Sequence, residues 1–507
     1  MQEVPRGRLM LKRHKKTGGV NSMLKLIDEI LQQFRICFKR EETFAWFVIV
    51  VVGMLIRTEM KGITAIIGCL SLEPRHYEAM LHFFRSKAFD LENIKSKWQS
   101  IVLEHIKPVM MDGYIMLIGD HIKVAKEARH MPGVKKLHQD SENVGKAEYI
   151  FGHQHGMIGI LAEGKTNQCI PLDIELQDGV DEITCLKNDA PVTQEALKKL
   201  KEENNSILKM IQMVSRFVKS KGHKAIILLD AFFTSGDAFN AVEQVNNELG
   251  THGLTLITRA KANTVAFEEP EVPKKRGRGQ PRKYGKKITF KSVFKGMGDA
   301  FVTATLNLYG KNETVQYLCM DLIWKPVGRK IRFVLVKTNE KCMILACSDL
   351  NMHPEKIILA YSYRFKIEVS FKMLKHVIGG FCYHFWTTAM PKLSRFKTHN
   401  DLSQVTEKRD KEKIVLTMRA IEIFSFISCI AMGILTMISL QLPDLVWGRF
   451  SGWLRTRSSE TPSIETVRSV LQQELWRNNH KVSSYATLSS IHKYQNLEDR
   501  IPYRPSA

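Results

Sequence analysis

The 507-residue chain contains nine cysteines, and none of them stands in a CxxC pair. Their number is odd and they are scattered, which is typical of reduced thiols in a cytosolic compartment and not of a disulfide framework. Their spacing also argues against a structural zinc site. The composition, 44% hydrophobic and 25% charged, excludes wholesale disorder, and the length predicts more than one domain.

Long uncharged runs are equally scarce. The basic segment 1–19 is not followed by an apolar core and a small-residue cleavage site, so we expect no secretory signal. The uncharged run 43–56 falls short of the roughly 20 residues that cross a bilayer and is predicted to be a buried helix. The run 423–442 is long enough but is diluted by Ser, Thr and Gln, which favours a core helix. We therefore expect no membrane partner.

Acidic residues are outnumbered in this chain. There are 75 Lys and Arg against 52 Asp and Glu, which gives a formal net charge of +23. A surplus of this size suits a polyanion, and nucleic acid is the commonest such partner. A basic protein with no polyanionic partner is the alternative that composition leaves open.

The spacing of apolar residues changes along the chain and indicates its organisation. Helical spacing dominates the first part, strands alternate with helices in the second, and a strand-rich segment then precedes a return to helix. The predicted parts are a helical region over 1–110, a mixed α/β sheet over 111–261, a β-rich insertion over 262–349, a continuation of the sheet core over 350–447, and a helical region with a tail over 448–507. Within the second part we expect strands at 114–120, 147–161, 169–176, 224–233 and 254–260, and helices at 194–219 and 235–249.

One segment of the first part has the pattern of a helix-turn-helix. Residues 60–86 read as two helices separated by a break at 71–74. The second helix carries Arg75, His76, His82 and Arg85. A DNA-reading role is one interpretation, and an ordinary corner of a helical bundle is the other.

The β-rich insertion opens with a basic segment, "KKRGRGQPRKYGKK", at residues 274–287. It contains eight basic residues and no acidic one, including Arg276, Arg278, Arg282 and Lys283. Such a segment is often only a solvated loop. However, the interleaved Gly and Pro resemble arms that lay Arg along the minor groove of DNA, and we predict DNA contact for these four side chains.

Two apolar strands end in an aspartate. "IMLIGD" ends at Asp120 and "AIILLD" ends at Asp230. The carboxyl ends of neighbouring parallel strands are where ligands gather in open α/β sheets. Either residue alone could simply cap the following turn, but the pair favours a shared site.

A predicted helix at 358–386 carries charges of both signs on an otherwise apolar surface. At about 100° per residue, Tyr361, Arg364, Glu368 and Lys375 fall within one narrow stripe. Buried charge requires a partner, and an internal Arg–Glu pair is one solution. The other is that Glu368 joins Asp120 and Asp230 around a divalent metal while the cations face a phosphate backbone.

The three carboxylates without a cation would raise one another's pKa values. Mg²⁺ accepts a few carboxylates together with substrate phosphates, so it suits these residues, with Mn²⁺ as its substitute. Two such ions would activate water or a DNA 3′-hydroxyl and stabilise the leaving oxygen in a displacement at phosphorus.

The spacing Y-x2-R-x3-E-x6-K, met by Tyr361, Arg364, Glu368 and Lys375, resembles the signature of one group of DDE transposases of bacterial insertion sequences. Residues 126–153 and 363–386 also look like stretches of such enzymes. The resemblance implies an RNase H-like sheet interrupted by a β-rich insertion, with a helical N-terminal region for end binding and assembly. It also implies a metal-binding triad of Asp120, Asp230 and Glu368, and phosphate contacts by Tyr361, Arg364 and Lys375, with Lys372 assisting.

The function that we predict is a transposase that cuts and joins double-stranded DNA at the inverted-repeat ends of an insertion sequence and at its target. The resemblance further implies a homodimer in the synaptic complex and a cytoplasmic, nucleoid-associated location. Two alternatives are a transposase-derived DNA-binding protein that no longer cuts, and an RNase H-like structure-selective nuclease. His121, directly after Asp120, differs from the small hydroxyl residue that relatives often place near this position.

Overall fold

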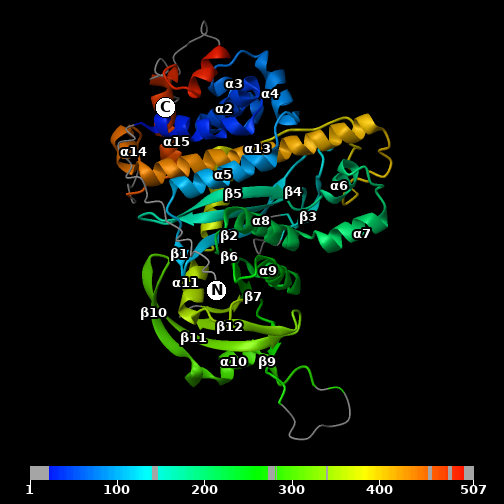
Figure 1. Cartoon of the computed structure of the whole chain (residues 1–507), viewed down its shortest axis with the longest axis vertical. Coiled ribbons are helices and arrows are strands. Elements are labelled where there is room, and N and C mark those ends of the chain that lie inside the picture. The colour runs from blue at the N-terminus through cyan, green and yellow to red at the C-terminus, as the bar shows by residue number, and fades with distance from the viewer. Residues whose placement is uncertain are drawn as a thin grey trace, which may run out of the picture.

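A mixed β-sheet with helices on both faces forms the centre of the molecule in the computed structural model (Figure 1). The structure describes residues 22–139, 145, 147–271, 280, 282–338, 341–394, 396–454, 460–477 and 482–495. The main path of the sheet runs β3-β4-β2-β6-β7-β13-β12-β11-β8-β9. The strands are β1 Met110–Met111, β2 Tyr114–Ala125, β3 Lys135–His138, β4 Tyr149–Ala162, β5 Gln168–Leu176, β6 Ala225–Leu229, β7 Leu254–Ala260, β8 Val265–Phe267, β9 Lys287–Thr289, β10 Val302–Leu308, β11 Lys311–Trp324, β12 Arg329–Lys337 and β13 Cys342–Cys347.

The core of this sheet has the strand order β5-β4-β2-β6-β7. Strands β2, β6 and β7 are parallel, whereas β4 pairs antiparallel with both β2 and β5. All five residues of β6 are buried because helices cover both faces of the sheet at this point. The predicted α/β, RNase H-like fold is therefore confirmed.

Two helices cover one face of the core, namely α8 (Ser206–Lys221) and α9 (Gly236–Leu249). The prediction of one helix over 194–219 was wrong, because α7 (Gln194–Glu203) ends before α8 begins. The side chain of Asn205 accepts the backbone N–H groups of Ile207 and Leu208 and so starts a new helix. Helical periodicity continues across this break, which is why the sequence pattern concealed it.

The opposite face carries the long helix α13 (Lys408–Gln441) together with α5 (Leu91–His105). Helix α13 is apolar and long enough to cross a membrane, but 94% of its most apolar window is buried inside the protein. Its serine and threonine hydroxyls bond within the fold, for example Thr436 to the carbonyl of Met432 at 2.9 Å. The prediction of a core helix for the run 423–442 is therefore confirmed.

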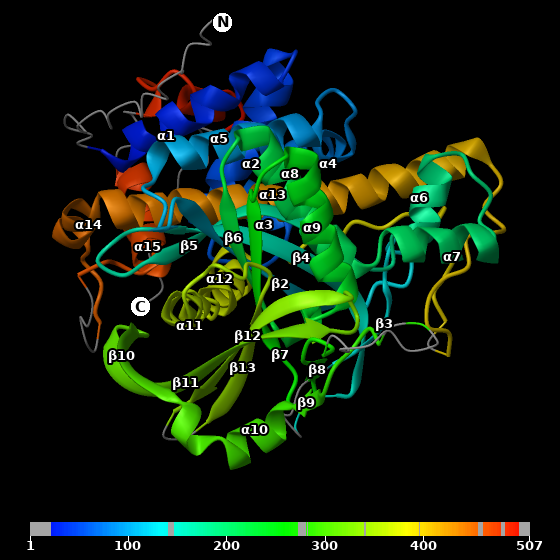
Figure 2. The same ribbon diagram turned by 60° about the horizontal axis from the view of Figure 1, so that its bottom comes forward.

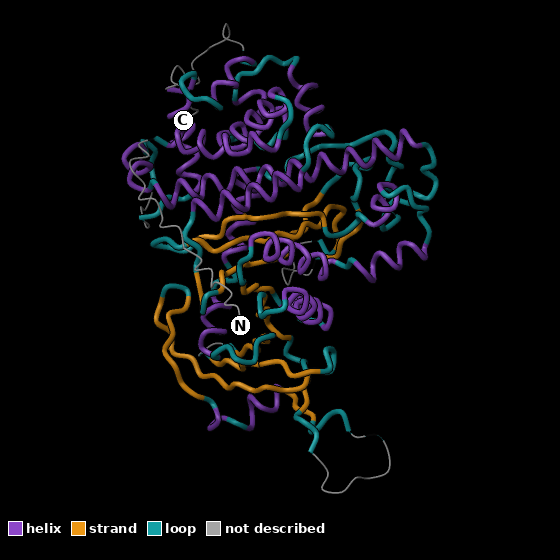
Figure 3. Tube along the Cα trace, in the orientation of Figure 1, coloured by secondary structure: helices purple, strands orange, loops and turns teal. Residues whose placement is uncertain are grey.

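The strand-rich segment continues the central sheet. Strand β13 pairs antiparallel with β7, with Ile344 opposite Ala260, and β12, β11 and β10 follow in turn. A short helix, α10 (Phe290–Gly296), precedes these strands. Figure 3 shows strands concentrated in this half of the molecule and helices in the other half.

The N-terminal and C-terminal helices form the helical half, where the two ends of the described chain lie together (Figure 1). Asp28 accepts N–H groups of Thr487 and Leu488 at 2.9 Å each, which joins the first helix to the last segment. The other helices are α1 Met23–Gln32, α2 Glu41–Ile56, α3 Ile63–Cys69, α4 His76–Arg85, α6 Asp181–Lys187, α11 Pro354–Ser362, α12 Lys366–Met373, α14 Pro443–Arg449 and α15 Ile464–Arg477. Helix α2 is buried from Phe44 to Ile56, as predicted for its uncharged run.

Candidate active site

Asp120 and Asp230 lie side by side because of strand register. Ile118 of β2 pairs with Leu228 of β6 in a parallel ladder. Asp120 lies two residues further along β2, which continues past the predicted strand end to Ala125, and Asp230 directly follows the last residue of β6. A side chain two residues further along points to the same face. Gly119 faces α8, where an added Cβ would meet the sulfur of Met210 at 3.0 Å, so Asp120 points to the opposite face.

The segment predicted to be one helix over 358–386 consists of three pieces, so that prediction was wrong. Helix α11 ends at Ser362, α12 runs from Lys366 to Met373, and a π-helical turn, Leu374–Ile378, follows. Tight bonds from the Arg364 N–H to Tyr361 and from the Lys366 N–H to Tyr363, both 3.0 Å, separate α11 from α12. Both helices lie between α13 and the strands β10–β13 (Figure 2).

Arg364 joins two of the three predicted metal ligands. Its Nη1 lies 3.0 Å from Oδ2 of Asp120, and its Nη2 bonds Oε1 of Glu368. Asp120 and Arg364 are mostly buried, whereas the Glu368 side chain is 58% exposed. The internal ion pair between Arg364 and Glu368, which was one of the two interpretations of the charged stripe, is therefore present. Arg364 also pairs with Asp120.

The pKa values of the two aspartates show that they share one electrostatic environment. Burial, followed by the neighbouring charge of Asp230, raises the pKa of Asp120 to about 7, against the lowering effect of Arg364. Burial also raises the pKa of Asp230, and Glu368 contributes in the same direction. All three carboxylates thus lie around the Arg364 guanidinium.

The other members of the predicted stripe lie in different surroundings. Burial raises the pKa of the Tyr361 hydroxyl, which lies near Arg364 and Asp230. Lys372 and Lys375 are exposed and form no ion pair among the described residues. The structure therefore brings Tyr361 and Arg364 to the carboxylates and leaves the two lysines at the surface.

Two residues near this site were not predicted from the sequence. Arg259, near the end of β7, is close enough to oppose the rise in the pKa of Tyr361. Tyr309, at the tip of the β10–β11 hairpin, packs its ring against that of Phe365, with the ring centres 5.4 Å apart and the planes tilted by 56°. The strand-end position of Arg259 was a usable signal, but the approach of the hairpin depends on sheet pairing that local sequence does not encode.

His121 packs inward beside Asp120. Its ring lies 4.8 Å from that of Phe233 and 5.5 Å from that of Phe232. Burial lowers its pKa to about 4, so the imidazole is neutral at neutral pH. Its backbone N–H donates to Oδ1 of Asp120 at 2.7 Å, so His121 orients that carboxylate through its main chain.

The chemistry of the three carboxylates fits a hard divalent cation. The raised pKa values of Asp120 and Asp230 reflect buried charge and mutual repulsion, which an added cation relieves. As arranged, no three acidic, His or Cys side chains among the described residues are grouped closely enough to hold an ion. The Arg364 guanidinium supplies the compensating charge in this arrangement.

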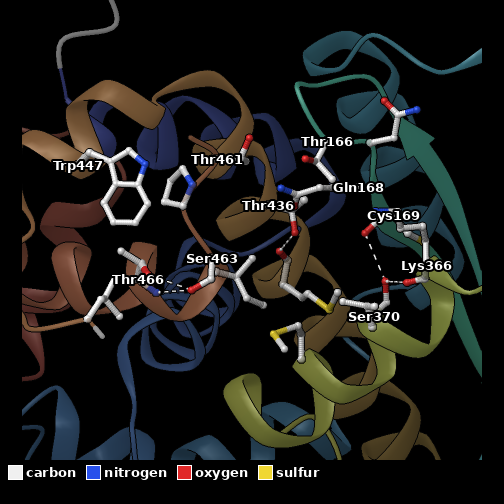
Figure 4. Close-up of a pocket in the computed structure, with 17 residues that line it drawn as sticks. Thr166, Gln168, Cys169, Lys366, Ser370, Thr436, Trp447, Thr461, Ser463 and Thr466 are labelled. Carbon is white, nitrogen blue, oxygen red and sulfur yellow. Dashed lines mark hydrogen bonds between the residues drawn. The ribbon is translucent and has the colours of Figure 1, made fainter. Parts of the chain in front are cut away.

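A cavity of about 420 Å³ lies against the other side of α12 (Figure 4). The α12 residues that line it are Lys366, Val369, Ser370 and Met373. At about 100° per residue, these four centre on the side of the helix opposite Glu368. Trp447 and the hydroxyls of Ser463 and Thr466 form the far wall (Figure 4). The helix therefore has the carboxylate site on one side and a cavity on the other.

Two of the four basic residues predicted to contact DNA are described, and they lie away from the carboxylates. Arg276 and Arg278 are outside the described residues, while Arg282 and Lys283 are exposed just before β9. Strand β9 is the last on the path of the sheet, seven positions from β2. Arg282 and Lys283 therefore lie far from Asp120 along the sheet.

The predicted helix-turn-helix segment consists of α3 and α4 with a break between them. The His76 ring lies 5.7 Å from Trp46 and 5.2 Å from Tyr494, inside the helical half. Arg85 donates to the carbonyl of Trp386 at 3.2 Å. These two side chains are thus engaged in internal contacts.

Comparison with known families agrees with this geometry. A family model described as "DDE superfamily endonuclease" matches residues 33–296, which include Asp120 and Asp230 and end before Glu368. No curated protein matches the chain. The family model spans more than half of the sequence and includes the paired aspartates, and the chain therefore belongs to the DDE superfamily endonucleases.

Proposed function

We propose that the chain is a transposase that cleaves DNA strands at the inverted-repeat ends of a mobile element and transfers them to a target. The family supports endonuclease or transposase chemistry. The observation that carries the proposal is the register that sets Asp120 beside Asp230, with Glu368 brought to the same guanidinium. The surplus of basic residues over acidic ones suits a DNA substrate.

Asp120, Asp230 and Glu368 would hold Mg²⁺, or Mn²⁺ in its place. Bound there, two divalent ions would supply Lewis-acid activation of the attacking oxygen and stabilisation of the leaving one. In the absence of a cation, Asp120 with its raised pKa keeps a proton on its carboxyl group near neutral pH. Cation binding must release that proton, so we expect cleavage to rise with pH around 7.

Arg364 and Tyr361 would position the phosphate. A guanidinium can bind a phosphate through two parallel hydrogen bonds. Arg364 can therefore release the carboxylates of Asp120 and Glu368 and bind the DNA phosphate beside the scissile bond instead. The raised pKa of Tyr361 keeps its hydroxyl protonated, so it can donate a hydrogen bond to a phosphate oxygen. Lys372 and Lys375, both exposed, add point charges nearby. Because a transposase acts on both ends of the mobile element, we expect a homodimer. We expect it to act on the DNA of the nucleoid.

The test is strand cleavage of a duplex that carries the inverted repeat flanking the coding region, with Mg²⁺ or Mn²⁺. We expect the wild type to cut at the repeat end and Asp230→Asn to be slower by about a thousandfold, since a lost metal ligand removes several kcal/mol. Asp189→Asn is the matched control, because Asp189 is exposed and its carboxylate pairs, among the described residues, only with Lys411 at 3.0 Å. It should cleave like the wild type.

Three outcomes would contradict the proposal in different ways. Salt-sensitive binding without cleavage would indicate a DNA-binding protein that no longer cuts. Cleavage of branched junctions with no preference for the repeat would indicate a structure-selective nuclease. Equal cleavage by the wild type and Asp230→Asn would show that the paired aspartates take no part in the reaction.

A further inference from the structure

The chain segment that follows the Glu368-bearing helix is held by side-chain cations through its backbone carbonyls. Arg57, Arg468 and Lys126, which we call the cation cluster, donate to it. The carbonyls that accept these bonds belong to Val377, Ile378, Gly379, Phe381 and Tyr383. The first two of them are the last residues of the π-helical turn that extends α12.

Arg57 is the most enclosed member of the cation cluster, with 0% of its surface exposed. Its Nη2 donates to the carbonyls of Ile378 and Gly379 at 2.9 Å each, and its Nη1 donates to Gly62 at 2.8 Å. Burial lowers its pKa, and it forms no ion pair with a described carboxylate. A buried guanidinium paired only with carbonyls is stabilised by the partial negative charge at a helix C-terminus.

The other two members bond the same segment from different directions. Arg468 donates to the carbonyl of Val377 at 2.6 Å, and its only carboxylate contact among the described residues is with the exposed Glu465 at 3.8 Å. Lys126 donates to the carbonyls of Phe381 and Tyr383, the latter at 3.1 Å, and lies 3.6 Å from the centre of the Tyr383 ring. Burial lowers the pKa of Lys126 to about 8.

The three cations come from distant parts of the chain. Arg57 follows α2 of the N-terminal helices, Arg468 lies on α15, and Lys126 directly follows β2. Strand β2 carries Asp120, so Lys126 connects the strand of one carboxylate to the segment beyond the helix of another.

Packing holds α12 on its inner side, where Ile367 and Phe371 are buried and the helix contacts β2 and β5. The side of α12 opposite Glu368 borders the cavity in Figure 4, and Val369 on that side is 46% exposed. Arg364 contacts Glu368 on the other side, but that contact must open for a cation or a phosphate to enter. The C-terminal end of the helix is the part that the cation cluster holds by direct bonds.

We propose that Arg57, Arg468 and Lys126 are positioning residues that set Glu368 against Asp120 and Asp230 by holding the carbonyl end of the Glu368 helix. The inference rests on the proposed function for its catalytic consequence. None of the three reaches substrate or reacting atoms, so each acts through the position of Glu368.

The test uses Arg468→Met and Lys126→Met in the full-length protein, with Arg468→Lys as the conservative variant. Arg419→Met is the matched control, because Arg419 also donates to backbone carbonyls, at 3.2 Å to Ser86 and 2.5 Å to Phe89. Those two carbonyls lie between α4 and α5 and not in the segment that follows α12. Three quantities are measured: Mn²⁺ affinity by electron paramagnetic resonance of the free ion, hydrogen exchange of the α12 amides, and DNA affinity. Arg468 is at the edge of the cluster, so its variants remain informative if Lys126→Met does not fold.

We expect Arg468→Met and Lys126→Met to weaken Mn²⁺ binding roughly tenfold, as is typical when a group that orients a ligand is lost. Exchange of the α12 amides should accelerate, DNA affinity should stay at the wild-type value, and Arg468→Lys should recover part of the Mn²⁺ affinity. The inference is overturned if Mn²⁺ affinity and α12 exchange match those of Arg419→Met. If the wild type binds no Mn²⁺, the proposed function fails, and the exchange of α12 alone then decides whether the cation cluster holds the helix.

Discussion

At the scale of single residues, Asp120 links the site to the stability of the fold. Its pKa is raised from an ordinary value near 3.8 to about 7, mainly by burial. A carboxyl group with a raised pKa binds more protons in the folded than in the unfolded protein between these values. Its contribution to stability is therefore fully present below about pH 4 and is lost as the pH rises through about 7.

Asp120→Asn should consequently stabilise the protein at pH 8 in the presence of EDTA. The amide removes the buried charge, and we expect Tm to rise by roughly 2–4 °C. At pH 4 the two proteins should melt alike, because Asp120 is then protonated. Thermal melts followed by circular dichroism at both pH values make the comparison. An equal rise in Tm at pH 4 and pH 8 would show that the buried charge of Asp120 is not the cause of the stabilisation.

Individual site residues were predictable where local sequence carries the signal. The apolar runs before Asp120 and Asp230 predicted that the two carboxylates lie together, because parallel strands in register present equivalent residues side by side. The partner of Arg364 was not predictable. The sequence allowed either a phosphate contact or an internal ion pair, and only the position of β2 relative to α12 brings Asp120 within 3.0 Å of the guanidinium.

At the scale of secondary-structure elements, the turn after α12 depends on Gly379. Its φ is +68°, and an added Cβ would lie 2.5 Å from the Met60 sulfur and 3.1 Å from Nη2 of Arg57. Gly222, which ends α8, has a φ of +67° and nothing within 4 Å of such a Cβ. The two glycines thus share a backbone conformation and differ in crowding.

Gly379→Ala should therefore destabilise the protein more than Gly222→Ala does. The left-handed backbone alone costs about 1 kcal/mol in both, and crowding against Arg57 adds roughly 1–3 kcal/mol at Gly379. Urea unfolding midpoints of the two variants measure the difference. Equal midpoints would mean that Met60 and Arg57 move aside without cost, and that the turn is not tightly held.

Elements were predicted better than their ends. The strands and most helices appear where apolar periodicity placed them, but 194–219 and 358–386 each read as one helix and are interrupted. The cause is the same in both cases. A cap at Asn205 and two tight turns around Arg364 change the backbone over two or three residues without disturbing the 3.6-residue pattern on either side.

At the scale of the whole molecule, strand pairing between distant segments decides where charge lies. The β-rich segment joins the central sheet through β13 and β7, so Arg282 and Lys283, just before β9, are carried to the far end of the sheet path. No local pattern encodes this pairing. The charge of +23 predicted a polyanionic partner, but not that Arg282 and Lys283 would lie away from the carboxylates.

This arrangement predicts that Arg282 and Lys283 affect DNA affinity and not the chemical step. Each Lys or Arg that neutralises a phosphate contributes about 0.9 to the slope of log affinity against log salt. The double variant Arg282→Ala/Lys283→Ala should therefore reduce that slope by roughly 2. Cleavage at saturating DNA should stay at the wild-type rate, because β9 is seven strand positions from β2.

The matched control is Lys198→Ala/Lys199→Ala, which removes the same charge from exposed positions of α7 that are 80% and 75% exposed. Lys198 lies 3.9 Å from Glu202, and Lys199 lies 3.9 Å from Glu203. The positive charge of these lysines is therefore partly balanced by carboxylates on the same helix. Their loss should leave the slope unchanged. If both double variants lowered the slope equally, net charge alone would govern DNA binding. A slope unchanged in both would place the phosphate contacts elsewhere, and the exposed Lys372 and Lys375, which follow Glu368 along the chain, would be the next pair to replace.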